Sequence, residues 1–216
     1  MGTLQNGLMG GFSGKVGPVV GATWRNKNII RSAPQLSNKP RSQAQLSNQS
    51  NFGLVSTFLV KYRSFINAYF IPDADCKAAY GSAMSYHRKH ANIQQDGLYY
   101  MNYPKVLISK GTLPGVLGIT LTSLPNNGLQ LTWEDNSEQT LAAPNDLLTV
   151  ATYAPALHTF YFFGACAERQ DTTVQLTIPA GFTEQNLQLW ATFTDQAAHP
   201  TAATSCYVGE VNGVRN

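Results

Sequence analysis

The sequence has 216 residues, 43% of them hydrophobic, and a formal net charge of +3. Only 12% are charged, about half the usual quarter, yet ten Phe, ten Tyr and three Trp supply bulk for a core, which argues against disorder. We expect no membrane span, since no run approaches about 18 apolar residues. Residues 1–11 lack the regions of a signal peptide, which predicts a cytoplasmic protein, a phage-particle component or export without a signal peptide.

Charge is distributed unevenly along the chain. Residues 1–110 hold thirteen Lys or Arg and three Asp, whereas residues 111–216 hold two Arg and nine Asp or Glu. The first acidic residue is Asp73. This asymmetry indicates either a polyanion or a complementary neighbour as partner, or two halves of one chain that face each other. Both interpretations stay open.

Residues 1–41 are predicted to form a glycine-rich, basic arm. β-prone residues flank the turn-forming Asn26-Lys27-Asn28, which predicts a hairpin over about residues 19–32 with a flexible glycine lead-in. Because glycines bury no side chain, we expect the arm to be ordered by contact with another subunit. The predicted assembly interface comprises Phe12, Val16, Val19, Val20, Trp24, Ile29 and Ile30, and the predicted basic patch comprises Lys15, Arg25, Lys27, Arg31, Lys39 and Arg41.

A helical hairpin is predicted for residues 42–97. The first helix begins at Ser42, where Gln45 completes a capping box, and it ends at Pro72. The second helix covers about residues 75–92. Its packed side is marked by Ala79, Tyr80, Ala83, Met84 and His87.

From Leu98 onward the pattern changes to short strands separated by Pro, Asn, Asp and Gly, which predicts an antiparallel β-sandwich over residues 98–216. Leu129, Leu131 and Trp133 alternate with polar neighbours, and a Trp on such a strand resembles an immunoglobulin or fibronectin type III module. The fold class is therefore α+β, and this likeness carries no function. The expected strands are Lys105–Lys110, Gly118–Ser123, Leu129–Trp133, Leu147–Tyr153, Thr159–Ala167, Thr172–Ile178, Leu187–Thr194 and Ser205–Val211.

The motifs for cofactor and metal binding are weak. Residues 10–15 resemble a phosphate-binding loop, but the spacing is one residue short and Val16 replaces the Ser or Thr that would bind magnesium. His87 and His90 share a helix face, whereas Cys76 is about three turns away and does not complete a zinc site. We interpret the two histidines as surface groups that complement the helix dipole. No cofactor is predicted.

The cysteines and carboxylates indicate no catalysis either. Cys166 and Cys206 fit neighbouring strands, and buried free thiols are the favoured interpretation over a pair. Neither forms a local nucleophile signature with His158 or His199. The acidic residues of the second half gather at turns, where solvated carboxylates are favoured over a calcium site. We therefore expect that the protein is not an enzyme.

The N-terminal residues resemble a known family. The matching segments are Gly-Gly-Phe-Ser-Gly-Lys-Val-Gly at 10–17, Val-Gly-Ala-Thr-Trp at 20–24, Ile-Arg-Ser at 30–32, Lys-Pro-Arg-Ser-Gln-Ala-Gln-Leu at 39–46 and Asn-Phe-Gly-Leu-Val at 51–55. They resemble an uncharacterised Bacteroidota family, a domain of unknown function, and the resemblance extends over the whole chain. It implies a bacterial or bacteriophage source and brings no catalytic residues.

The sequence thus predicts a structural protein that self-assembles through its arm into a filament, tube, lattice or particle. Its partner would be a second copy, because exposed strand edges and head-to-tail contacts give open polymers. Two alternatives remain. The basic arm with Phe12 and Trp24 would suit a nucleic-acid-associated protein, and the sandwich loops would suit a carbohydrate- or protein-binding module.

Overall fold

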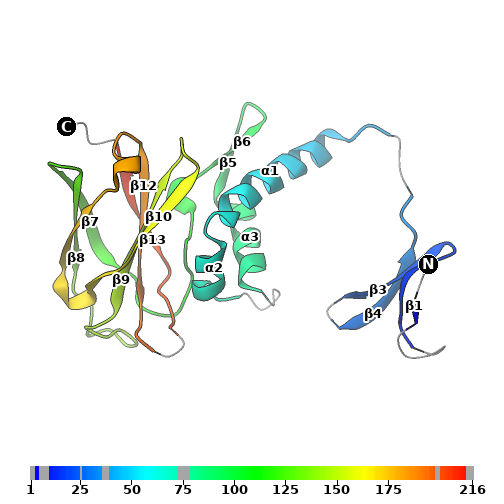
Figure 1. Cartoon of the computed structure of the whole chain (residues 1–216), viewed down its shortest axis with the longest axis horizontal. Helices are drawn as coiled ribbons and strands as arrows, with labels where there is room; N and C mark the ends of the chain where they lie inside the picture. The colour runs from blue at the N-terminus through cyan, green and yellow to red at the C-terminus, as the bar shows by residue number, and fades with distance from the viewer. Residues whose placement is uncertain are drawn as a thin grey trace. The chain divides into compact units, whose positions relative to one another are not determined.

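The computed structural model describes residues 3–4, 10–24, 26–35, 39–72, 78–197 and 200–212. It divides into two compact units, Met1–Ser42 and Gln43–Asn216. The described residues lie mostly in antiparallel sheets, with three α-helices among them (Figure 1). We describe each unit by itself.

The first unit is a four-stranded antiparallel sheet. Gly17 and Pro18 form the two-residue turn between its second and third strands, and Gly17 has the positive φ of 56° that such turns favour. Residues 19–32 form a hairpin, and the segment before it, expected as a flexible lead-in, is itself a strand of the sheet. The strands pair in the order β1 (Thr3–Leu4), β2 (Phe12–Val16), β3 (Val19–Trp24) and β4 (Lys27–Ser32).

The second unit begins with the helices, and the single helix predicted from Ser42 to Pro72 is wrong. The chain leaves the helical path at Lys61 and Tyr62, which buries the Tyr62 ring edge-on against Phe58. Apolar residues keep a spacing of three and four on both sides of this break, so periodicity alone does not register it. The helices are α1 (Gln43–Val60), α2 (Arg63–Tyr69) and α3 (Ala79–His90).

A short hairpin follows α3. Strands β5 (Asn92–Gln95) and β6 (Leu98–Met101) pair across Asp96 and Gly97, which both have positive φ. The prediction of a helical hairpin over residues 42–97 overlooks this element, although Asp-Gly between short strands is a strong hairpin signal.

Two larger antiparallel sheets complete the second unit. They have the strand orders β10-β9-β12-β13 and β11-β8-β7. Both sheets contribute side chains to one apolar cluster, for example Leu131 of β8 and Leu189 of β12. The strands are β7 (Leu117–Leu124), β8 (Gly128–Glu134), β9 (Leu147–Ala154), β10 (Thr159–Glu168), β11 (Thr173–Thr177), β12 (Leu187–Thr194) and β13 (Cys206–Val211).

The three helices cover the face of the β10-β9-β12-β13 sheet that points away from this cluster (Figure 1). Trp190 of β12 and Tyr153 of β9 join a second apolar cluster with Phe58 and Leu59 of α1. All eight residues of β12 are therefore buried. Polar residues such as Gln188 and Thr192 alternate with apolar ones in this strand, a pattern typical of a strand with one solvated face, but here the helices bury that face too.

The predicted strand Lys105–Lys110 is wrong. The chain forms a 3-10 turn, η1 (Tyr103–Lys105), and then an extended segment outside the sheets. The backbone N–H groups of Ile108 and Ser109 donate to the Ser205 hydroxyl, at 2.9 and 3.3 Å, in place of strand carbonyls. A side chain distant in sequence thus satisfies this backbone.

Candidate functional site

The predicted assembly residues lie on both faces of the N-terminal sheet, strands β2 to β4. Directly paired residues of antiparallel strands point to the same face, so the register assigns each side chain. Val16 pairs with Val19, and Ile30 pairs with Gly21. The ring of Phe12 lies where a Cβ on Gly21 would be, which places it on the same face. We call this surface the uncharged face; it comprises Phe12, Val16, Val19 and Ile30 with Gly14, Gly21, Thr23, Asn28 and Ser32.

The opposite face combines apolar and basic residues. Val20 pairs with both Lys15 and Arg31, and Trp24 pairs with Lys27. The alternation of strands brings these groups together, although they are spread over the sequence. We call this surface the basic face; it comprises Lys15, Val20, Ala22, Trp24, Lys27, Ile29 and Arg31.

Both faces are largely open to solvent. Val16 is 52% exposed, Ile30 67% and Trp24 57%. Among the described residues of the first unit, Gly21 alone is buried. A sheet is normally stabilised by a second layer packed on an apolar face, and the described residues of this unit form no such layer.

Two further residues of the predicted basic patch lie outside the strands of this sheet. Lys39 and Arg41 are exposed and follow its last strand. Arg25 lies outside the described residues. The sheet therefore unites three of the six predicted basic residues.

His87 corrects the prediction of a surface histidine. Its side chain is fully buried, as its place on the packed side of the helix implies, whereas His90 is exposed. The Nδ1–H donates to the Ala83 carbonyl at 2.7 Å, and Nε2 accepts the Leu107 N–H at 3.3 Å. Burial lowers the pKa of His87 from 6.5 to about 4, so the ring is neutral. Both nitrogens are engaged, which leaves neither for a metal, and Cys76 lies outside the described residues.

The cysteines are not on neighbouring strands, so that expectation is wrong. Cys166 lies on β10 and Cys206 on β13, the two edges of one sheet, with β9 and β12 between them. Both are free, half-buried thiols. Burial raises the pKa of Cys166 to about 11, the opposite of what activates a nucleophile. His199 lies outside the described residues.

One carboxylate of the second half is buried and not solvated at its turn. Asp146 accepts hydrogen bonds from Nε and Nη2 of Arg169 at 3.1 and 2.9 Å. Arg169 also donates to the side chain of Asn136 and to the Pro114 carbonyl, and its guanidinium lies 4.0 Å from the Phe193 ring centre. The prediction missed this centre; its only signal is a lone Arg in an acidic region. Among the described residues, no three His, Cys, Asp or Glu side chains gather as metal ligands.

The comparisons place the chain in a family. It belongs to DUF6266, a family of unknown function, whose match extends over residues 11–209 and so includes both units. No curated protein matches the sequence. Among solved structures it is similar to the fn3 domain of human contactin 1, with 8% identity and a TM-score of 0.34 over 50% of this chain and 85% of that one. No helix in the described part of the chain has the length and hydropathy to span a membrane.

Proposed function

We propose that the protein is a non-enzymatic structural protein that self-assembles through the N-terminal sheet into a filament, tube, lattice or particle. The observation that carries this proposal is a sheet within the family match from residue 11 onward, whose described residues form a single layer with apolar side chains on a face where they carry no charge. Burying an apolar side chain such as Val16 or Ile30 contributes roughly 1.5–3 kcal/mol, which offsets the cost of ordering a glycine-rich sheet.

The occupant that we propose for these faces is a second copy of the chain. The first 72 residues contain no acidic residue, so every charged side chain of the N-terminal sheet is positive. The second unit exposes negatively charged carboxylates, which complement the positive charges of the N-terminal sheet. A sheet that docks on the second unit of the next copy gives a head-to-tail contact. The exposed acidic residues among the described residues of this unit are Asp96, Glu134, Asp135, Glu138, Asp171, Glu184 and Glu210.

The test is the mass and shape of the purified full chain, by light scattering coupled to size-exclusion chromatography and by negative-stain microscopy. We expect large assemblies at low salt. Ile30→Thr, on the uncharged face, should shift the protein toward monomer, and Ile93→Thr, at an exposed position of β5, is the matched control. A protein that stays strictly monomeric at high concentration and low salt contradicts the proposal.

The basic face supports nucleic-acid association as a second candidate function. Lys15, Lys27 and Arg31 share that face with Trp24, and cations beside an aromatic ring suit phosphate neutralisation and base stacking. Affinity for single- or double-stranded DNA or RNA should then fall steeply as salt rises. Absence of binding at low salt would remove this candidate.

For the second unit we propose an immunoglobulin- or fibronectin III-like sandwich that carries the helices on one outer face. The apolar cluster shared by the two larger sheets supports this arrangement. An experimental structure of the second unit tests this arrangement.

From the N-terminal pattern of residues 10–55 we also infer a Bacteroidota bacterium or its phage as the source. The genomic neighbourhood of the coding sequence tests this inference.

A further inference from the structure

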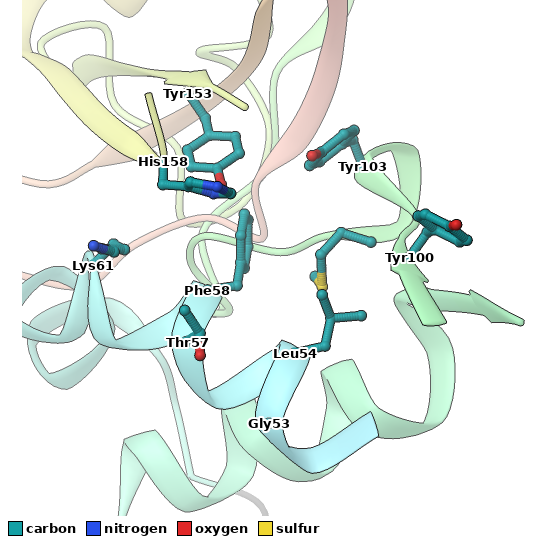
Figure 2. A pocket seen from close by; sticks show the side chains of 10 residues that line it. Gly53, Leu54, Thr57, Phe58, Lys61, Tyr100, Tyr103, Tyr153 and His158 are labelled. Carbon is teal, nitrogen blue, oxygen red and sulfur yellow. The ribbon is translucent and has the colours of Figure 1, made fainter. Parts of the chain in front are cut away.

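A pocket of about 320 Å³ lies in the second unit between α1, β6 with η1, and the end of β9 (Figure 2). Four of its ten lining residues are Phe or Tyr. Phe58 and Tyr153 meet edge-to-face with ring centres 5.1 Å apart, and the ring centre of Tyr103 lies 5.9 Å from that of Tyr153. Leu54 and Met101 add aliphatic surface. The volume falls at the lower end of the range of small-molecule sites in proteins, roughly 300–1,000 Å³.

Gly53 is one of the residues that line this pocket. It lies in the interior of α1, where glycine costs about 1 kcal/mol relative to alanine. A Cβ at Gly53 would meet no atom within 4 Å, so packing within the described residues does not require a glycine. Position 53 therefore has room for a methyl group. We expect this methyl group to compete for space with an occupant of the pocket that Gly53 lines.

The charges of the pocket restrict the class of ligand. Its lining contains Lys61 and His158 and no carboxylate. Figure 2 shows His158 beside Tyr153, and the Tyr153 hydroxyl lies 3.4 Å from Nδ1 of His158. Lys61 directly follows the last residue of α1 and lies at the same end of the pocket (Figure 2). This arrangement disfavours a cation and favours an anion near Lys61 with an apolar body against the rings.

We propose that the pocket bounded by Gly53, Phe58, Lys61, Tyr103, Tyr153 and His158 binds small aromatic carboxylates. The aromatic body packs against Phe58 and Tyr103, and the carboxylate lies toward Lys61 and His158. The site is contained in the second unit, so binding does not depend on assembly.

The test is a titration of the ¹⁵N-labelled full chain with 1-naphthylacetate, followed by NMR. We expect saturable shifts of the Gly53 and Thr57 amides, with a dissociation constant in the millimolar range or below. 1-Naphthylmethylamine, the cationic analogue, should bind at least about tenfold more weakly. Shifts that do not saturate by roughly 5 mM carboxylate, or equal affinity for the amine, overturn the proposal.

Two glycine variants separate binding from folding. Gly53→Ala should raise the melting temperature, because alanine favours the helix, and yet weaken 1-naphthylacetate binding about tenfold. Gly81→Ala is the matched control: Gly81 lies in α3, also with no atom within 4 Å of a Cβ, and does not line the pocket. It should raise the melting temperature and leave the affinity unchanged. Unchanged affinity in Gly53→Ala contradicts the proposal.

Discussion

The buried His87 connects α3 to the extended segment that follows η1. Its ring bridges the Ala83 carbonyl and the Leu107 amide, two backbone groups that would otherwise lack these partners in the interior. A neutral imidazole makes both bonds at once, because one nitrogen donates and the other accepts. Protonation would turn the accepting nitrogen into a donor facing a donor.

The pH dependence of stability should therefore report on His87. The pKa of His87 is about 4 in the folded protein, against an ordinary value of 6.5. Below pH 6.5 the unfolded chain therefore binds a proton at His87 that the folded chain does not bind until the pH nears 4. The free energy of unfolding should fall between pH 6.5 and 4, by about 3 kcal/mol in total. Urea denaturation across this range measures it.

Two variants identify the titrating group. His87→Gln cannot titrate and should lack this part of the pH dependence, whereas His90→Gln, at an exposed position, should retain it. A wild-type curve that runs parallel to that of His87→Gln through the whole range would contradict the assignment.

The Arg169–Asp146 pair should be the most sensitive polar centre of the second unit. Both side chains are almost fully buried. Asp146→Ala leaves the guanidinium charge buried and unpaired, which should lower the free energy of unfolding by about 3–5 kcal/mol. The double variant Arg169→Met/Asp146→Leu should recover part of this loss, because no buried charge remains. Glu184→Ala is the exposed control, and a loss below about 1 kcal/mol in Asp146→Ala would refute the expectation.

At the scale of elements, the N-terminal sheet depends on the close approach of β2 and β3. A Cβ on Gly21 would overlap the Phe12 carbonyl and ring. Gly21→Ala should therefore separate these two strands and abolish assembly, with little change in the melting temperature of the second unit. Amide exchange of Lys15 and Val20 measures the pairing.

Gly111→Ala provides the reciprocal control for this prediction. A Cβ on Gly111 would overlap the Ala202 backbone in the second unit. This variant should lower the melting temperature of the second unit and leave the β2–β3 amides protected. Protected β2–β3 amides in Gly21→Ala would show that the sheet tolerates the methyl group.

At the scale of the molecule, the second unit should fold without the N-terminal sheet. It holds both apolar clusters, and neither includes a described residue of the first unit. Deletion of residues 1–32 should leave a soluble protein with a nearly unchanged melting temperature that no longer assembles. Calorimetry measures the melting temperature, and light scattering measures the assembly state. If the deletion variant is unfolded, the N-terminal sheet is part of the protein's own core and the prediction is wrong.

Substitution of Trp24 tests the same separation in the full chain. Trp24 is exposed on the basic face, so Trp24→Ala removes surface that a neighbour would bury. Assembly should weaken more than the melting temperature falls. A melting temperature that drops sharply while assembly persists would mean that Trp24 serves the fold of its own chain.

Local pattern determined much of this protein. Turn residues and alternation located seven of the predicted C-terminal strands to within about two residues, because Pro, Gly and Asn restrict the backbone locally. The hairpin of residues 19–32 and the unequal charge of the two halves also follow from residue order alone. Local pattern identified neither the strand Phe12–Val16, which was expected as a flexible lead-in, nor the face of the sheet to which each side chain belongs.

Tertiary contacts decided the rest. The break at Tyr62 and the irregular path through Ile108 each depend on partners that are distant in the sequence, and no local pattern encodes them. Helical spacing placed His87 on the packed side of its helix, but its bond to the Leu107 amide is a tertiary contact. The buried polar face of β12 and the pocket around Phe58 arise only when the helices pack on the sheet. Burial is a property of two surfaces that meet, and the sequence of either surface does not specify which other surface it will meet.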